Sequence, residues 1–250
     1  MLIITGISFL FVFIACNKSS DNTAPGPTPV DPVAAVLNLP ATSFNYANIV
    51  QPGYLNGPNI LGQINTAANN PITDNGATLG RVLFYDKNLS INNTISCASC
   101  HKQASAFSDP LVKSKGFNGG LTGRNSMGLT DAKYYPNGRF FWDQRAATLE
   151  DQTLMPIQDL VEMGMTLAQL ETKLRALAYY PPLFTKAFGD NTINSNRISL
   201  ALSQFVRSII SFQSRYDAGR SAFPVMPAPP PNAVFPNFTP QENRGKELFL

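Results

Sequence analysis

The pentad Cys97-Ala98-Ser99-Cys100-His101 is the most specific motif in this chain. Two thiols separated by two residues, followed at once by a histidine, form the pattern by which c-type heme is attached. One helical turn brings both sulfurs to the same edge of a porphyrin, where they add to its two vinyl groups. We therefore predict covalent heme c on Cys97 and Cys100, with His101 as the proximal ligand of the heme iron.

The small numbers of cysteine and histidine residues exclude the main alternatives. The 250 residues include three Cys and one His. A four-cysteine or histidine-rich zinc site cannot be built from that set. A thioredoxin-like redox pair needs a βαβ setting that the sequence does not indicate, and a disulfide across two residues is strained.

Composition limits the class of protein further. The hydrophobic fraction is 44%, which is enough to bury a core, and 17 Phe and 8 Tyr argue against disorder. The formal net charge is +3, from 19 basic and 16 acidic residues. Because the charges are balanced and no basic stripe stands out, we expect no nucleic-acid partner.

The amino terminus indicates export and lipid anchoring. Residues 1–15 form an apolar, uncharged run that is too short to span a bilayer, and we predict a signal peptide. The run ends at Cys16 after a small residue, as in the lipobox of bacterial lipoproteins, so we expect Cys16 to be lipidated. Residues 16–56 are then a flexible, Pro-rich tether, and the protein is periplasmic or otherwise in the cell envelope. An ordinary signal peptide with an incidental cysteine is the alternative.

The rest of the chain reads as helix and long loop. Apolar periodicity predicts helices over residues 77–86, 166–178 and 195–210, the second with Thr166 and Gln169 in capping-box spacing and the third with Ser195 as cap. Residues 221–238 are Pro-rich and predict a stiff linker or a long surface crossover. Residues 239–250 open another helix, with Thr239 as its cap.

Several motifs around the pentad carry a family resemblance. They are Leu79-Gly80-Arg81-Val82-Leu83-Phe84-Tyr85-Asp86, Leu89-Ser90, Phe107-Ser108-Asp109, Gly123-Arg124-Asn125, Phe140-Phe141-Trp142-Asp143-Gln144-Arg145-Ala146, Leu149-Glu150-Asp151-Gln152, Pro156 and Val161-Glu162-Met163-Gly164. In this order they resemble the amino-terminal heme domain of bacterial diheme cytochrome c peroxidases, the family that includes the MauG-type enzymes. The resemblance covers roughly residues 76–217.

The resemblance implies a mainly α fold of two cytochrome-c-like domains, each with one heme. We expect the peroxidatic domain over residues 57–220 and the start of a second, truncated domain over residues 239–250. It also implies reduction of hydrogen peroxide to water at the amino-terminal heme. Electrons would come from a small donor protein, such as a monoheme cytochrome c or a cupredoxin, through the second heme. Homodimers are common in the family.

Site residues follow from the resemblance position by position. Glu162 resembles the distal acid–base carboxylate, and Gln152 the distal glutamine that orients peroxide. Trp142 resembles the tryptophan between the hemes, and Asn125 a side-chain ligand of an interface calcium ion. Taken alone, Glu162 would be a solvated charge, Trp142 a core residue and Gln152 an ordinary helix-face residue.

Two features depart from the family pattern. Many members block the resting heme with a distal histidine in the glycine-rich loop, whereas residues 116–120 of this chain read GFNGG. We therefore expect a sixth iron position that is open or water-bound at rest. The second CxxCH is also absent, and the family places it shortly after a segment like residues 244–249. We expect that the sequence is a fragment, with one heme here and two in the full protein.

Three other functions stay open at this stage. One is a MauG-like oxidase acting on a protein or organic substrate, and another is a non-catalytic surface lipoprotein. The third is a monoheme electron carrier with a methionine as the sixth iron ligand. The candidate methionines are Met127, Met155, Met163, Met165 and Met226.

The first testable prediction concerns the native exported polypeptide. We expect a chain longer than residues 1–250 with two covalently bound hemes, as measured by intact mass and heme content. A mature chain ending at Leu250 with a single heme would instead favour the monoheme carrier.

Overall fold

A computed structural model describes residues 31–250 as helices joined by long loops. Within that range isolated β-bridges take the place of strands, which confirms the prediction of a mainly α chain. The predicted signal peptide, Cys16 and residues 17–30 of the predicted tether lie outside the described residues. None of the described helices is both long and apolar enough to cross a membrane.

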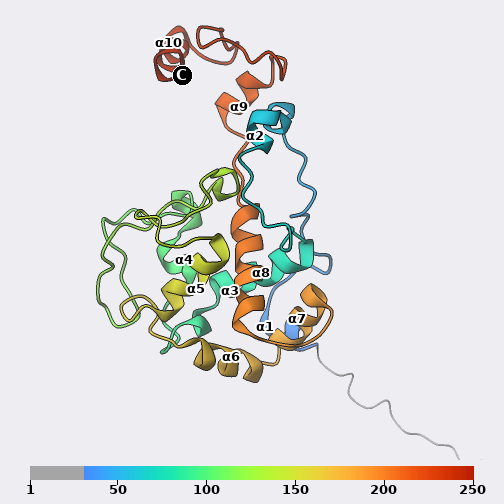
Figure 1. The fold of residues 1–250 in the computed structure, drawn as a ribbon, viewed down its shortest axis with the longest axis vertical. Helices are drawn as coiled ribbons and strands as arrows, with labels where there is room; N and C mark the ends of the chain where they lie inside the picture. Colours follow the sequence, from blue (N-terminus) through green and yellow to red (C-terminus); the bar gives the residue numbers. More distant parts are fainter. Residues whose placement is uncertain (1–30) are drawn as a thin grey trace, which may run out of the picture. The chain divides into compact units, whose positions relative to one another are not determined.

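The elements follow one another along the chain as Figure 1 shows. The α-helices are α1 (Pro32–Val36), α2 (Pro58–Leu61), α3 (Asp74–Tyr85), α4 (Cys97–Cys100), α5 (Leu149–Gln158), α6 (Leu167–Ala176), α7 (Tyr180–Phe188), α8 (Ser195–Ser208), α9 (Arg215–Arg220) and α10 (Pro240–Phe249). Short 3-10 turns lie at η1 (Gly53–Asn56), η2 (Lys87–Leu89), η3 (Gln103–Ser105) and η4 (Ala132–Tyr134).

The helices expected from periodicity are present, with shifted ends. The predicted helix over residues 77–86 starts earlier, because the Thr73 side chain accepts a hydrogen bond from the Gly76 amide and begins α3 at Asp74. The capping boxes of α6 and α10 form as expected. The prediction that Ser195 caps α8 is wrong, because Asn194 is the cap and accepts from the Arg197 amide at 2.9 Å. This helix also ends at Ser208, before the predicted end at residue 210.

Apolar periodicity did not predict two of the helices, and both contain proline. Helix α7 has Pro181 and Pro182 in its first turn, where a missing N–H costs little. Helix α5 carries Pro156 two residues before its end. Proline is ordinarily read as a helix breaker, so composition alone favours loop at both places.

Residues 32–56, which belong to the predicted tether, make contacts with the helices that follow. Helix α1 lies in this range, and its Val33 is buried in the hydrophobic core. The amides of Tyr46 and Ala47 donate to Asp74 at 2.7 and 2.8 Å, and the Tyr54 hydroxyl donates to Asp217. These contacts give the backbone of this segment hydrogen-bond partners and bury one of its apolar side chains, which could not be read from its composition.

The core forms where α3 packs against α8. Gly80 of α3 lies so close to α8 that a Cβ added there would be 1.9 Å from the Ala201 carbonyl oxygen and 2.8 Å from the Phe205 Cβ. One turn earlier, a Cβ on Gly76 would lie 2.1 Å from the Gln204 Oε1 atom. The two glycines therefore form a groove on α3 into which α8 fits. The large side chains buried around this contact include Leu79, Leu83, Phe84, Ile198, Leu202 and Phe205.

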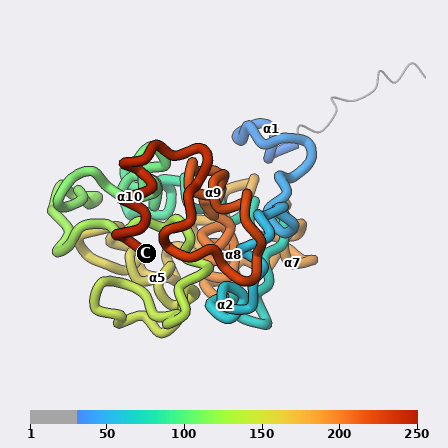
Figure 2. Tube along the Cα trace, turned by 90° about the horizontal axis from the view of Figure 1, so that it is seen from above, coloured from blue at the N-terminus to red at the C-terminus, as the bar shows by residue number. Residues whose placement is uncertain are grey.

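Residues 221–238 do not extend away from the helices before them. Phe235 is 1% exposed and its ring centroid lies 5.3 Å from that of Tyr216 in α9. Arg215 also pairs with Glu242 of α10 at 3.0 Å. Figure 2 shows this segment as a loop between α9 and α10. Of the two interpretations of residues 221–238, these contacts favour a surface crossover.

The close approach of α3 and α8 predicts the effect of enlarging Gly80. Gly80→Ala should lower the free energy of unfolding by about 1–3 kcal/mol, the typical cost of overpacking, which outweighs the roughly 1 kcal/mol that Ala gains over Gly in a helix. Thermal unfolding of the heme-loaded protein measures this loss.

Gly245→Ala in α10 is the matched control. Beyond the neighbouring residues and the backbone of α10 itself, no atom lies within 4 Å of a Cβ added at Gly245, so only the helix propensity changes and α10 should become more stable. A similar rise in melting temperature for both variants would contradict the proposed packing constraint.

Candidate functional site

The predicted heme-attachment cysteines lie on one turn of helix. Helix α4 runs from Cys97 to Cys100, and a capping box between Ser96 and Ser99 starts it. Both cysteines are free and partly buried. Burial is the main cause that raises the pKa of the Cys97 thiol to about 12, and burial also raises the pKa of Cys100. The structure therefore presents two unpaired, neutral thiols on the same short helix.

His101 follows directly and its ring is held in one orientation. Its Nδ1 atom lies 3.0 Å from the Phe107 carbonyl oxygen. Since a carbonyl can only accept, Nδ1 carries the proton, which leaves Nε2 as the unprotonated nitrogen of a neutral ring. Burial lowers the pKa of His101, which favours the neutral ring. A neutral imidazole with its second nitrogen tied to a backbone carbonyl is the usual state of a metal-binding histidine.

One cavity of about 810 Å³ brings His101 together with the other predicted site residues. This volume lies within the range of pockets that hold cofactors and drug-sized ligands. The walls come from the loops over residues 122–145, from α5, from the turn after α5 and from Val206 of α8. The predicted site residues in the lining are His101, Asn125, Trp142, Gln152 and Glu162.

Glu162 reaches the cavity from a tight turn after α5. Asp159 accepts hydrogen bonds from the amides of Val161 and Glu162, at 2.8 and 3.0 Å. Burial, and secondarily the charge of Asp159, raises the pKa of Glu162, while Arg145 lowers it. A carboxyl group with a raised pKa inside a cavity can exchange protons nearer neutral pH than a solvated glutamate. The interpretation of Glu162 as a solvated surface charge does not fit this setting.

Trp142 and Asn125 lie together at the cavity wall. The Trp142 Nε1 atom donates to the Asn125 carbonyl oxygen at 2.9 Å, and 59% of Trp142 is exposed. The interpretation of Trp142 as a core residue is therefore wrong. Phe141 and Gln144, in the same loop, have left-handed backbone with φ of 70° and 56°. Such conformations cost roughly 1–3 kcal/mol in non-glycine residues and cluster at functional sites.

The amide side chain of Asn125 is used to brace its own loop. Its Nδ2 atom donates to the carbonyl oxygens of Leu111 and Asp109, at 2.7 and 3.2 Å. Within residues 31–250, no group of three or more His, Cys, Asp or Glu side chains is arranged to hold a metal ion. The calcium site therefore stays a prediction that rests on the resemblance.

A buried ion pair that the sequence analysis missed fixes α5. Arg207 of α8 is 2% exposed, and its guanidinium pairs with the Glu150 carboxylate, with Nη2 and Oε2 at 3.0 Å. Asn70 donates to the same carboxylate at 2.7 Å. Burial raises the pKa of Glu150, but the hydrogen bonds from Arg207 and Asn70 outweigh it, so the net pKa is lowered. Gln152 is two residues further along, so this pair positions its helix over the cavity.

Signals for this pair were present in the sequence. Glu150 stands within the quoted segment Leu149-Glu150-Asp151-Gln152, and Arg207 is a lone cation next to the apolar residues Phe205 and Val206. A charge at a buried helical position implies a partner, because an unpaired buried charge is costly. Which residue supplies that partner cannot be read from the pattern.

The five candidate methionine ligands have different positions. Met163 and Met165 are each 3% exposed and belong to the hydrophobic core, as methionines usually do, whereas Met226 is 61% exposed. Met127 lines the cavity and is the one methionine among the described residues that does so. The structure leaves Met127 as the best placed of the five for a role at this site.

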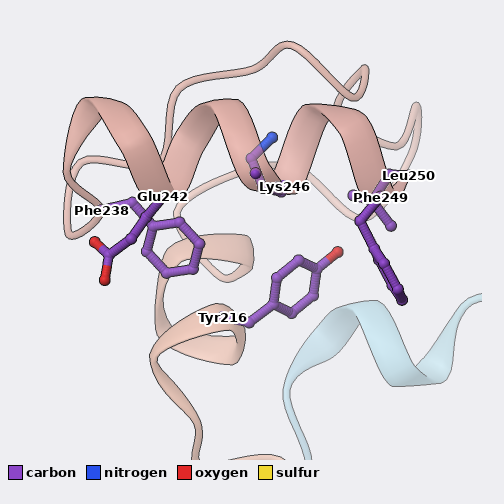
Figure 3. A pocket seen from close by; sticks show the side chains of 7 residues that line it. Tyr216, Phe238, Glu242, Lys246, Phe249 and Leu250 are labelled. Atoms are coloured by element: carbon purple, nitrogen blue, oxygen red, sulfur yellow. The ribbon is translucent and has the colours of Figure 1, made fainter.

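A second pocket of about 560 Å³ lies elsewhere, against α10. Figure 3 shows Tyr216, Phe238, Lys246 and Phe249 around it. None of the predicted site residues lines this pocket, so it is separate from the heme-attachment motif.

Comparison with known proteins identifies relatives of this arrangement. The model of the family described as di-haem cytochrome c peroxidase matches residues 74–221. The methylamine utilization protein MauG of Methylophilus methylotrophus is 36% identical over 148 residues, which cover 59% of this chain and 44% of the relative. The cytochrome c551 peroxidase of Pseudomonas aeruginosa is 30% identical over 157 residues, which cover 62% of this chain and 45% of that protein.

Solved structures agree with the sequence relatives. A crystal structure of a MauG-like protein associated with microbial copper homeostasis superposes with a TM-score of 0.65 at 33% identity. The superposition covers 78% of this chain and 54% of that one. The chain thus spans less than half the length of the curated relatives named above and about half of this structure.

The Glu150–Arg207 pair predicts a pH-dependent contribution to stability. Glu150→Gln should lower the free energy of unfolding by about 3 kcal/mol at pH 7, because it leaves a buried guanidinium without a counter-charge. The folded-state pKa of Glu150 is lowered, so its contribution is complete above the ordinary glutamate pKa of about 4.3 and is lost as pH falls through the folded value. Chemical denaturation at several pH values should therefore show that the difference in free energy of unfolding between Glu150→Gln and wild type becomes smaller below about pH 4.

Glu247→Gln is the control for this prediction. Glu247 pairs with Arg244 at 2.8 Å, but both side chains are exposed, so the loss should stay within about 1 kcal/mol. If both variants lose the same free energy of unfolding, burial does not make the Glu150–Arg207 pair more stabilising than an exposed pair.

Proposed function

This chain belongs to the di-haem cytochrome c peroxidase family, and we propose that its cavity reduces hydrogen peroxide to water at a covalently bound c-type heme. The observation that carries the proposal is the convergence of His101, Gln152 and Glu162 on one cavity beside the two free thiols of α4.

The residues present fit a c-type heme. Cys97 and Cys100 would hold the porphyrin through thioether bonds, and His101 would bind the iron through its free Nε2 atom. The wide cavity next to His101 fits a group of that size. When bound, the heme supplies an iron that binds peroxide and passes electrons to it.

Glu162 supplies the proton transfers in this proposal. Reduction of one hydrogen peroxide consumes two electrons and two protons and yields two waters. Glu162 would take the proton from one peroxide oxygen and deliver it to the other, which would leave as water when the O–O bond breaks. The raised pKa of Glu162 suits both directions, because the ideal proton carrier titrates near the working pH.

Gln152 and Trp142 have supporting parts. The amide of Gln152 orients peroxide by hydrogen bonding from the cavity wall that α5 forms. Trp142 lies at the same cavity with much of its ring exposed, so it offers an electron path between the heme and a partner at the surface.

The same exposure favours a second candidate function. An oxidase of the MauG type would withdraw electrons from a protein or organic substrate, and an exposed Trp142 suits electron transfer from a group outside the cavity toward the heme. The match to MauG at 36% identity supports this candidate. A monoheme carrier has less support, since a pure carrier has no need of a buried carboxyl at its cavity.

The finer expectations belong to the same proposal. They are export with a lipid anchor at Cys16, the domain bounds 57–220 and 239–250, a second heme in the full protein and a small electron-donor protein. An interface calcium at Asn125, homodimer formation and an open sixth position on the iron complete the set. An oxidised resting protein with a bis-histidine spectrum would refute the open position.

Glu162→Gln tests the proposed chemistry. We expect the rate of reaction with hydrogen peroxide to fall by about 10²–10⁴, the usual contribution of a general acid–base, while heme attachment stays normal. For wild type, the rate should fall as pH drops through the pKa of Glu162, at a higher pH than for an ordinary glutamate, since burial raises this pKa. Stopped-flow absorbance of the heme Soret band measures both effects.

Glu247→Gln provides the matched control, since this exposed carboxylate lies on α10 and outside the cavity lining. It should react with peroxide at the wild-type rate. If Glu162→Gln also reacts at that rate, Glu162 is not the proton carrier. Comparing peroxide turnover with oxidation of a protein substrate then separates the peroxidase from the oxidase.

A further inference from the structure

The glycine-rich loop over residues 116–120 contacts the turn that carries Glu162. The Phe117 amide donates to the Glu162 carbonyl oxygen at 3.0 Å. Gly116 approaches the same turn so closely that a Cβ there would lie 1.7 Å from the Val161 carbonyl oxygen. The loop is closed by its own hydrogen bond, from the Gly116 amide to the Gly120 carbonyl at 2.8 Å. The loop and the turn therefore pack backbone against backbone.

The Phe117 ring fills the space beside Gly164. Gly164 has φ of +68°, and a Cβ added there would lie 2.5 Å from the Cε1 atom of the Phe117 ring. The Phe117 carbonyl accepts hydrogen bonds from Asn92 at 2.9 Å and Thr94 at 3.3 Å, in the segment before α4. Phe117 thus joins the turn of Glu162 to the segment that leads into the heme-attachment helix.

The backbone of this turn is held on its other sides as well. Asp159 accepts from the Glu162 amide at 3.0 Å, and the Ile91 amide donates to the Met163 carbonyl at 3.0 Å. Both backbone groups of Glu162 are therefore engaged. Among residues 31–250, by contrast, neither a hydrogen bond nor an ion pair holds its carboxylate. The position of that carboxylate thus depends on the backbone that carries it.

We infer that Phe117 is a positioning residue, which holds the turn over residues 159–164 so that the Glu162 carboxylate stays directed at the cavity. The inference rests on the proposed role of Glu162 as proton carrier. Removing the ring would free the turn, and misplacing a reacting group by about 1 Å can cost roughly 100-fold in rate.

Two side-chain changes separate the ring from the backbone contact. Phe117→Ala removes the ring but keeps the amide that bonds to Glu162, whereas Phe117→Leu keeps an apolar group beside Gly164. Asn118→Ala is the matched control in the same loop, because the Asn118 side chain is exposed. All variants are compared as heme-loaded protein with normal heme content and spectrum.

The rate of reaction with excess hydrogen peroxide gives the first readout. We expect Phe117→Ala to slow it by about 10- to 100-fold, Phe117→Leu to recover most of the rate, and Asn118→Ala to match wild type. Adding Phe117→Ala to Glu162→Gln should cause no further loss, because Phe117 acts only through Glu162. Independent losses that multiply in the double variant, or a wild-type rate for Phe117→Ala, would overturn the inference.

Amide hydrogen exchange gives a second readout that does not depend on activity. In Phe117→Ala, amides over residues 161–164 should exchange at least about tenfold faster, while those of α8 stay unchanged. Unchanged exchange at 161–164 would overturn the inference even if the rate fell. If Glu162→Gln reacts at the wild-type rate, the proposed function fails instead, and hydrogen exchange still decides whether Phe117 holds the turn.

Discussion

The close contact between α3 and α8 holds the other elements of the protein in place. At Gly80 the two backbones approach so closely that no side chain fits between them, and Ala201 faces the gap with its carbonyl oxygen. Packing at this distance gives a rigid helix pair, because the atoms of both helices interlock and cannot slide without opening a void. The Gln204 side chain continues the contact into polar bonds, accepting from the Thr73 amide at 2.9 Å and donating to Asn70 at 2.8 Å. The helix pair is thus fixed both by shape and by hydrogen bonds.

A few contacts connect the segments that line the cavity to this helix pair. Arg207 extends the polar network from α8 to Glu150, and so sets the position of α5 and of Gln152. Both thiols come from α4 and the histidine follows it directly; Cys97 of this helix packs against the same core. Most of the cavity lining otherwise lies on loops, including strained residues such as Phe141. Loops adapt readily to a cofactor and to a substrate, but they need supports of the kind that Arg207 and Phe117 provide.

Much of this organisation was predictable from local patterns. The pentad over residues 97–101 indicates a short helix and a metal-binding histidine because its chemistry depends on sequence spacing alone. The capping residues Thr166 and Thr239 define helix starts for the same reason, since a cap bonds to amides three residues away. The spacing of Trp142, Gln152 and Glu162 pointed to one site only through family resemblance. No periodicity along the chain would bring three residues ten positions apart to a single cavity wall.

The α class, the attachment motif and the local helix starts can be read from the sequence, because they depend on contacts within a few residues. Which distant groups meet is set by the packing of the folded chain. Arg207 finds Glu150 across 57 positions, and Phe117 reaches Gly164 from a loop that composition marks only as glycine-rich. Residues 32–56 likewise join the core through Val33, although their composition favours a tether. Burial and partner choice are properties of the packed chain, because each depends on surfaces that exist only once the helices have come together.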